Sequence, residues 1–173
     1  MTIQFVAARV SSAIAIGTAL FVAGAGHAIA QKKGASAKDL VGTWTAVSVT
    51  TTQPDGKKSE PFGSKPVGIL NFDSQGRYNL QVCKPGRAKF AANARDKGTA
   101  DENRDSVTGC NPHWGKYTVA DGAINFQIEH AMYPNWEGTT QKRTFTIKGD
   151  TLTYNVPAAS TGGTAEVVWK RAK

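Results

Sequence analysis

The feature that most constrains the fold of this chain is an alternation of apolar and polar residues with a period of two, which recurs from Leu40 to the C-terminus. In the segment TQKRTFTIK, residues 140–148, the side chains of Arg143, Phe145 and Ile147 share one face, and residues of the other parity share the opposite face. A period of two is typical of β-strands that turn one face toward a core and the other toward water. We therefore expect strands throughout this region.

Turn residues separate the alternating segments, as in Pro-Asp-Gly at 54–56 and Ala-Asp-Gly at 120–122. About eight such strands joined mostly by short turns predict an all-β fold, an eight-stranded antiparallel barrel, with a two-sheet sandwich as the alternative. The absence of helix–strand alternation excludes a parallel α/β sheet. Residues 87–112 lack the strand pattern and predict one long loop containing a short helix, capped by Thr99 or Asp101.

The first thirty residues have the composition of a signal peptide. Arg9 precedes an apolar stretch rich in Ala and Gly, and Ala28-Ile29-Ala30 is a small-x-small cleavage signal. The alternatives are an uncleaved anchor and a buried helix. We expect a signal peptide over 1–30, a flexible leader over 31–38 and a barrel domain over 39–173. The chain is then exported, periplasmic or secreted, and no later segment is long and apolar enough for a transmembrane helix.

The charged residues and the cysteines limit the function further. The formal net charge is +8, but the basic residues form short scattered clusters and no continuous stripe with stacking aromatic residues, so nucleic acid is not the expected partner. In an oxidising compartment, Cys83 and Cys110 predict one disulfide, and two free buried thiols are the alternative. The histidines and acidic residues lack a metal-ligand spacing, and no cofactor motif occurs. We expect a monomer without metal or cofactor.

The interior of an eight-stranded barrel can hold side chains or one small ligand. An inward Arg143 must be paired or must bind something, so it is a candidate anchor for the carboxylate or other anion of an apolar ligand. An internal ion pair or a strand end that reaches water would also explain it. His130, on the face of Ile128, is either a satisfied core residue or a ligand-binding or acid–base group. The residues predicted to bind the ligand are Tyr78, Leu80, Tyr117, Phe126, Ile128, His130, Arg143, Phe145 and Tyr154.

Several short motifs follow one another in a fixed order along the chain. They are LVGTW at Leu40, PFG at Pro61, PVGILNF at Pro66, QVCKPGR at Gln81, GKYTV at Gly115, PNWEGTTQKR at Pro134 and VVWKR at Val167. Together they resemble the bacterial and fungal lipocalin-like domain family over about 130 residues. The resemblance implies a calycin-type β-barrel and, because most members are uncharacterised, says little about a ligand or a reaction.

The same resemblance implies a structural role for Trp44. In calycin barrels a tryptophan of the first strand plugs the closed end, and a basic residue of the last strand packs across it. Arg171 or Lys170 is placed to do this here, and Gly42 would let the backbone come close beside the pair.

Three functions are compatible with this sequence. The favoured one is an exported lipocalin-like protein that binds a small hydrophobic or amphipathic ligand, including an anionic one, inside the barrel. The second is a small isomerase, cyclase or hydrolase that uses the same cavity, which would need a polar dyad deep in the barrel. The third is a structural envelope module with a filled barrel that works through its basic surface or its long loop. No catalytic residue is assigned.

Overall fold

A computed structural model describes residues 34–173 of this protein. The predicted signal peptide and the beginning of the predicted leader therefore lie outside the described residues. The strands are β1 (Gly42–Thr52), β2 (Lys58–Ser59), β3 (Val67–Phe72), β4 (Arg77–Cys83), β5 (His113–Ala120), β6 (Ala123–Ala131), β7 (Thr140–Lys148), β8 (Thr151–Val156) and β9 (Thr164–Arg171). The helices are α1 (Ala37–Leu40), α2 (Ala100–Thr108) and the 3₁₀ turns η1 (Arg95–Lys97) and η2 (Pro134–Trp136).

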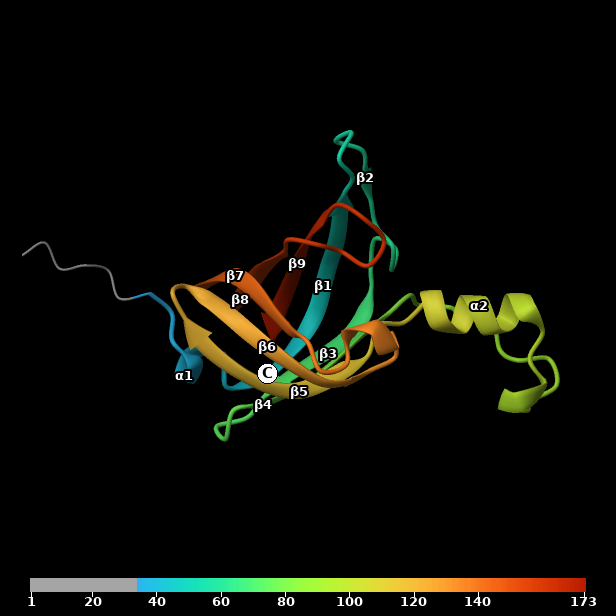
Figure 1. Cartoon of the computed structure of the whole chain (residues 1–173), viewed down its shortest axis with the longest axis horizontal. Coiled ribbons are helices and arrows are strands. Elements are labelled where there is room, and N and C mark those ends of the chain that lie inside the picture. Colours follow the sequence, from blue (N-terminus) through green and yellow to red (C-terminus); the bar gives the residue numbers. More distant parts are fainter. Residues whose placement is uncertain (1–33) are drawn as a thin grey trace, which may run out of the picture. The chain divides into compact units, whose positions relative to one another are not determined.

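The strands close into an antiparallel barrel, which confirms the predicted fold (Figure 1). The barrel order is β1, β3, β4, β5, β6, β7, β8 and β9, and β9 pairs back onto β1. The short strand β2 adds to the far end of β1, where Thr51 faces Ser59. Because each strand of the ring has a neighbour on both sides, the closed sheet has no free edge along it.

One end of the barrel is closed by Trp44. Its side chain is fully buried, and its indole Nε1 donates a hydrogen bond to the Leu40 carbonyl over 2.8 Å. The guanidinium carbon of Arg171 lies 4.0 Å from the centre of the indole ring. The guanidinium also donates to the carbonyls of Val41 and Asp39, over 3.0 and 2.7 Å. Arg171, not Lys170, is therefore the basic residue that packs across the plug.

Gly42 is required beside this stack. Its φ is +124°, a region that L side chains rarely adopt, and a Cβ at this position would lie 3.2 Å from Nη1 of Arg171. The helix α1 precedes it and was not predicted, because its four residues span the boundary between the predicted leader and the predicted barrel and show no helical pattern. At its N-terminus the Asp39 carboxylate accepts from the backbone N–H and from the hydroxyl of Ser36, each over 2.7 Å.

The half of the barrel next to the plug is filled with side chains. Five large residues of this core are completely buried: Trp44, Leu70, Ile124, Leu152 and Trp169. They come from five different strands of the ring, so the side chains of opposite walls meet in the middle. Removing this apolar surface from water is the main source of the barrel's stability.

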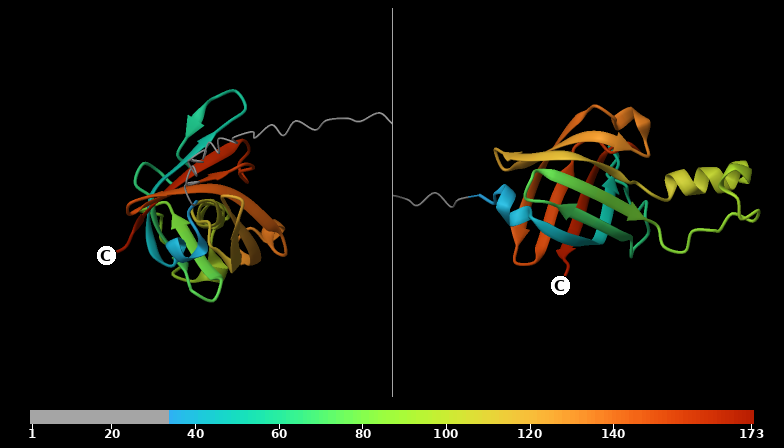
Figure 2. Two further views of the ribbon diagram at one scale, coloured as in Figure 1. Left: turned by 90° about the vertical axis from the view of Figure 1, so that its left-hand side faces the viewer. Right: turned by 90° about the horizontal axis from the view of Figure 1, so that it is seen from below.

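The helix α2 lies in the predicted long loop and is capped at its N-terminus by Thr99, as expected. The Thr99 hydroxyl accepts from the Glu102 amide, and the Glu102 carboxylate accepts from the Thr99 amide over 2.8 Å. No residue of α2 is buried. The helix extends away from the barrel at the end opposite α1 (Figure 2).

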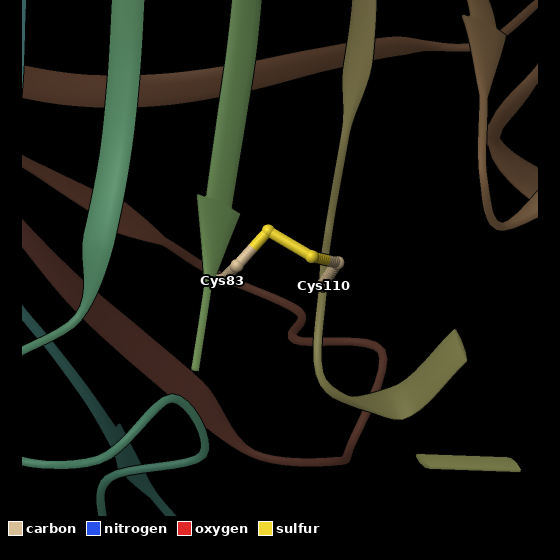
Figure 3. Close-up of a disulfide and its surroundings, with 2 residues drawn as sticks. All are labelled: Cys83 and Cys110. Carbon is tan, nitrogen blue, oxygen red and sulfur yellow. A yellow bond between two sulfur atoms is a disulfide. The ribbon is translucent and has the colours of Figure 1, made fainter. Parts of the chain in front are cut away.

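The predicted disulfide between Cys83 and Cys110 is confirmed. It joins the end of β4 to the segment that leads from α2 into β5 (Figure 3). Two backbone hydrogen bonds flank it, from Lys84 to Gly109 and from Asn111 to Val82, each over 2.8 Å. The disulfide therefore closes the base of the loop that carries α2.

A β-bulge interrupts the pairing of β5 with β6. Trp114 faces His130, but the next residue, Gly115, faces Ile128, so Glu129 is an extra residue on β6. Beyond Ile128, the bulge reverses which residues of β6 point into the barrel and which point outward. Gly115 allows it because a Cβ there would collide with the Gln127 carbonyl. The prediction that His130 shares the inward face of Ile128 is wrong for this reason.

Replacement of Arg171 by Met should destabilise the barrel by about 2 kcal/mol, since it removes a cation–π contact and two hydrogen bonds to carbonyls. The measurement is the free energy of unfolding in urea. Lys170→Met is the matched control, because Lys170 is the exposed neighbour on the same strand. Equal stability of the two variants would contradict the role assigned to Arg171.

The Cys83→Ser/Cys110→Ser double variant should lose about 3.5 kcal/mol of stability, the loop-closure value for a disulfide spanning 27 positions. Urea unfolding of the double variant and of the oxidised protein measures the difference. A reductant should destabilise the oxidised protein and leave the double variant unchanged. A double variant as stable as the oxidised protein would show that the disulfide does not restrict the unfolded chain.

Candidate functional site

The half of the barrel away from Trp44 contains a cavity of about 360 Å³. Its wall is apolar over Val49, Leu80, Val82, Val156 and Val167. The connections at the α2 end of the barrel surround it and contribute Phe62, Cys110, Trp136 and Ser160. The barrel is therefore filled at one end and hollow at the other.

The predicted site residues fall into four groups in the structure. Leu80, Arg143 and Tyr154 line the cavity. Phe145 is half-buried against the core, and His130 is exposed outside the barrel. The others are buried in the core: Tyr78, Tyr117, Phe126 and Ile128. Three of the nine predicted residues thus line the cavity, and His130 lies outside the barrel.

Arg143 is the charged group of the cavity. It is only 3% exposed, and its Nη2 donates to the Gln141 side-chain oxygen over 2.7 Å. The guanidinium carbon lies 4.7 Å from the ring centre of Phe126 and 5.2 Å from that of Tyr154. Its buried Nε has no hydrogen-bond partner, and no carboxylate within residues 34–173 forms a salt bridge with it. The inward placement agrees with the strand parity, and the alternatives of an internal ion pair and a water-reaching strand end are not observed in the described chain.

His113 is a cavity residue that the sequence analysis did not select. It is 2% exposed, it lines the cavity, and its Nδ1 lies 2.8 Å from the hydroxyl of Tyr78. The signal was present in the sequence, because His113 has the same parity on β5 as Tyr117, which was placed inside the barrel. The His113–Tyr78 pair is a buried polar dyad of the kind that the enzyme alternative would need.

The side chains of Arg143, His113 and the two tyrosines lie around the ring of Phe126. The ring centres of Tyr78, Tyr154 and His113 lie 4.7, 6.0 and 6.2 Å from it. Arg143 lies over the same ring. Two tyrosines, one histidine and one arginine from four strands thus surround a single aromatic side chain of the core, and three of these residues (His113, Arg143 and Tyr154) line the cavity.

The electrostatics of this cluster follow from burial and from the arginine. Burial raises the pKa of the Tyr78 and Tyr154 hydroxyls above their ordinary value, an effect that the positive charge of Arg143 partly offsets. Burial, reinforced by Arg143, lowers the pKa of His113 well below its ordinary value. At neutral pH the tyrosines and His113 are therefore uncharged, and the cluster carries the single positive charge of Arg143.

His130 takes part in a separate, exposed group of side chains. Its side chain is 63% exposed, its Nδ1 lies 3.4 Å from a Glu137 carboxylate oxygen, and its ring centre is 4.9 Å from that of Trp114. Arg77 lies over the Trp114 ring, 5.6 Å from its centre, and forms an ion pair with Glu129 over 2.8 Å. His130 therefore does not line the cavity and is not part of the site.

Within residues 34–173 there is no group of three or more His, Cys, Asp or Glu side chains arranged to bind a metal ion. None of the helices in this part of the chain has the length and apolar character needed to cross a membrane.

The lowered pKa of His113 predicts a pH dependence of stability. Below about pH 6.5 the unfolded chain takes up a proton at this histidine that the folded protein excludes. The free energy of unfolding should therefore fall as the pH decreases below that value, and the His113→Gln variant should show a shallower fall. Urea unfolding at a series of pH values measures it, with exposed His130→Gln as the control. Parallel profiles for wild type and His113→Gln would contradict the prediction.

Two solved structures are similar to this chain at low identity: a redesigned β-barrel (TM-score 0.42, 16% identity, 81% of this chain and 97% of that one) and the wild-type fluorescent protein UnaG (TM-score 0.38, 10% identity, 78% of this chain and 98% of that one).

Two sequence comparisons identify the family. A curated relative, the 4'-hydroxy-3'-methoxypropiophenone carrier protein of Aspergillus oryzae, is 34% identical over 82 residues, which make up 43% of this chain and 74% of the relative. The model of the lipocalin-like domain family matches residues 41–172, which include every strand of the barrel. The chain belongs to the lipocalin-like domain family.

Proposed function

We propose that this protein binds a small, largely apolar molecule inside its barrel and holds an anionic or acceptor oxygen of that molecule against Arg143. The observation that carries the proposal is the burial of Arg143 on an apolar cavity with no salt-bridge partner in the described chain. A ligand anion would supply the missing partner.

The energetics favour an anion at this position. A buried charge without a counter-ion is costly, and the faces of Phe126 and Tyr154 offset only part of that cost. One Nη group is already bonded to Gln141, which fixes the plane of the guanidinium. A carboxylate or phenolate oxygen in the cavity would interact with a charge that is already desolvated, so the interaction is stronger there than in water.

The size and lining of the cavity limit the ligand class. A volume of about 360 Å³ is at the lower end of the range for small-molecule sites, and the wall is mostly aliphatic and aromatic. A compact aromatic or short aliphatic molecule suits it better than a peptide or a polysaccharide. A curated relative is named as the carrier of an aryl ketone with hydroxyl and methoxy groups. That name supports a small aromatic ligand for this chain too.

We also propose that the protein acts after export, in the periplasm or outside the cell, as a carrier. The composition of residues 1–30 and the disulfide of the barrel domain support this. The cavity favours ligand binding over the alternative of a filled structural barrel. Detection of the mature N-terminus at Gln31 in protein from the host's envelope would test export, and a retained Met1 would contradict it.

The binding test compares two ligands of the same shape, cinnamate and its neutral amide. Wild type should bind cinnamate about 10-fold more tightly, because only the acid brings a negative charge that pairs with the Arg143 guanidinium. In Arg143→Met this preference should disappear. Isothermal titration calorimetry measures both affinities.

Lys142→Met is the matched control, because Lys142 is the outward-facing neighbour of Arg143 on β7. It should keep the preference for cinnamate. The aryl ketone named for the fungal relative is titrated alongside. Binding of none of the three ligands, or equal cinnamate binding by wild type and Arg143→Met, would contradict the proposal.

A further inference from the structure

We propose that His113 is a second ligand-binding residue, which donates a hydrogen bond into the cavity from Nε2 because Tyr78 fixes its tautomer. Together with Arg143 it would select a ligand group that has two oxygen acceptors, as a carboxylate has. This inference rests on the proposed function and names the ligand chemistry of the same cavity.

The first step concerns the hydroxyl of Tyr78. Tyr78 is 3% exposed, and within residues 34–173 its hydroxyl has one hydrogen-bond partner, Nδ1 of His113 at 2.8 Å. If Nδ1–H were the donor, the buried O–H proton of Tyr78 would have no acceptor, which is costly. The O–H group therefore donates to Nδ1. A neutral imidazole that accepts at Nδ1 carries its proton on Nε2.

The second step concerns the charge of His113. The groups that face it are Tyr78 from β4, Phe126 from β6, Trp136 from η2 and the positive charge of Arg143 from β7. None of them carries a negative charge that would stabilise an imidazolium. His113 therefore stays neutral and acts as a hydrogen-bond donor, which argues against a role as a general base.

The third step concerns what the two donors select. His113 and Arg143 both line the cavity beside the ring of Phe126, and Nε2 of His113 has no hydrogen-bond partner in the described part of the chain. A carboxylate can accept from both groups at once. A ketone offers one neutral oxygen, which the two donors would have to share, and it brings no negative charge to Arg143. The acid should therefore bind more tightly than the ketone.

The tautomer is measured first, without any ligand. Long-range ¹H–¹⁵N NMR spectra of the ¹⁵N-labelled protein distinguish a protonated from an unprotonated ring nitrogen. Nε2 of His113 should be protonated and Nδ1 unprotonated at pH 7, with no titration around neutral pH. Tyr78→Phe keeps the ring contacts and removes the hydroxyl, so it should give a mixture of tautomers. A protonated Nδ1 in wild type, or a His113 that titrates near pH 6.5, would overturn the inference.

Binding is measured next, with cinnamate and with 4-phenylbut-3-en-2-one, which has a methyl group in place of one carboxylate oxygen. His113→Phe keeps an aromatic ring and removes the donor, so its affinity for cinnamate should fall about 10-fold while its affinity for the ketone changes less than about 2-fold. His113→Gln restores an N–H donor and should recover much of the loss. His130→Phe, outside the barrel, should change neither affinity.

The outcomes separate this inference from the proposed function. Cinnamate binding that depends on Arg143 but is unchanged in His113→Phe overturns the role of His113 and leaves the carrier proposal intact. Equal losses for acid and ketone in His113→Phe overturn the two-acceptor selection, because they indicate a change in cavity shape. Binding of a ketone but not of cinnamate by wild type overturns the two-acceptor selection alone. Failure of wild type to bind cinnamate, its amide and both ketones overturns both proposals.

Discussion

The structure depends on the pairing of the first strand with the last. β1 pairs with β9 from Trp44 opposite Arg171 to Thr52 opposite Thr164, and this pairing converts an open eight-stranded sheet into a ring. The same register brings the Arg171 guanidinium over the indole of Trp44 and within reach of the carbonyls that precede β1. The pairing of β1 with β9 therefore both closes the sheet into a ring and closes one end of the barrel. Without it, both outer strands would expose unpaired backbone groups.

Because of this plug, the two halves of the barrel differ: one is filled with side chains and the other contains the cavity. At the Trp44 end the interior is packed solid, so the ring does not need a ligand to fill it. The opposite end can then keep a cavity, with the disulfide fixing the base of the loop beside it. Within that cavity Arg143 is held by Gln141 and by two aromatic faces. The protein thus holds a desolvated positive charge with which a bound anion could form an ion pair.

Much of the fold and part of the site could be predicted from local pattern. The two-residue period identified the strands and the inward position of Arg143, because parity within one uninterrupted strand is a local property. The even cysteine count predicted the disulfide, and Thr99 was recognisable as a helix cap. His113 was readable from its parity with Tyr117 but was passed over. Helix α1 was missed because four residues in a polar segment carry no periodic signal.

The chain by itself determined an all-β barrel and a buried arginine, since both depend on side-chain type and strand parity. The plug role of Trp44 followed from the resemblance to the lipocalin-like family. Only the tertiary structure decided which histidine faces the ligand. The bulge at Glu129 turns His130 to the outside, and the pairing of β4 with β5 sets His113 opposite Leu80 and beside Tyr78. A bulge is a property of two strands in register, so the sequence of either strand alone does not reveal it.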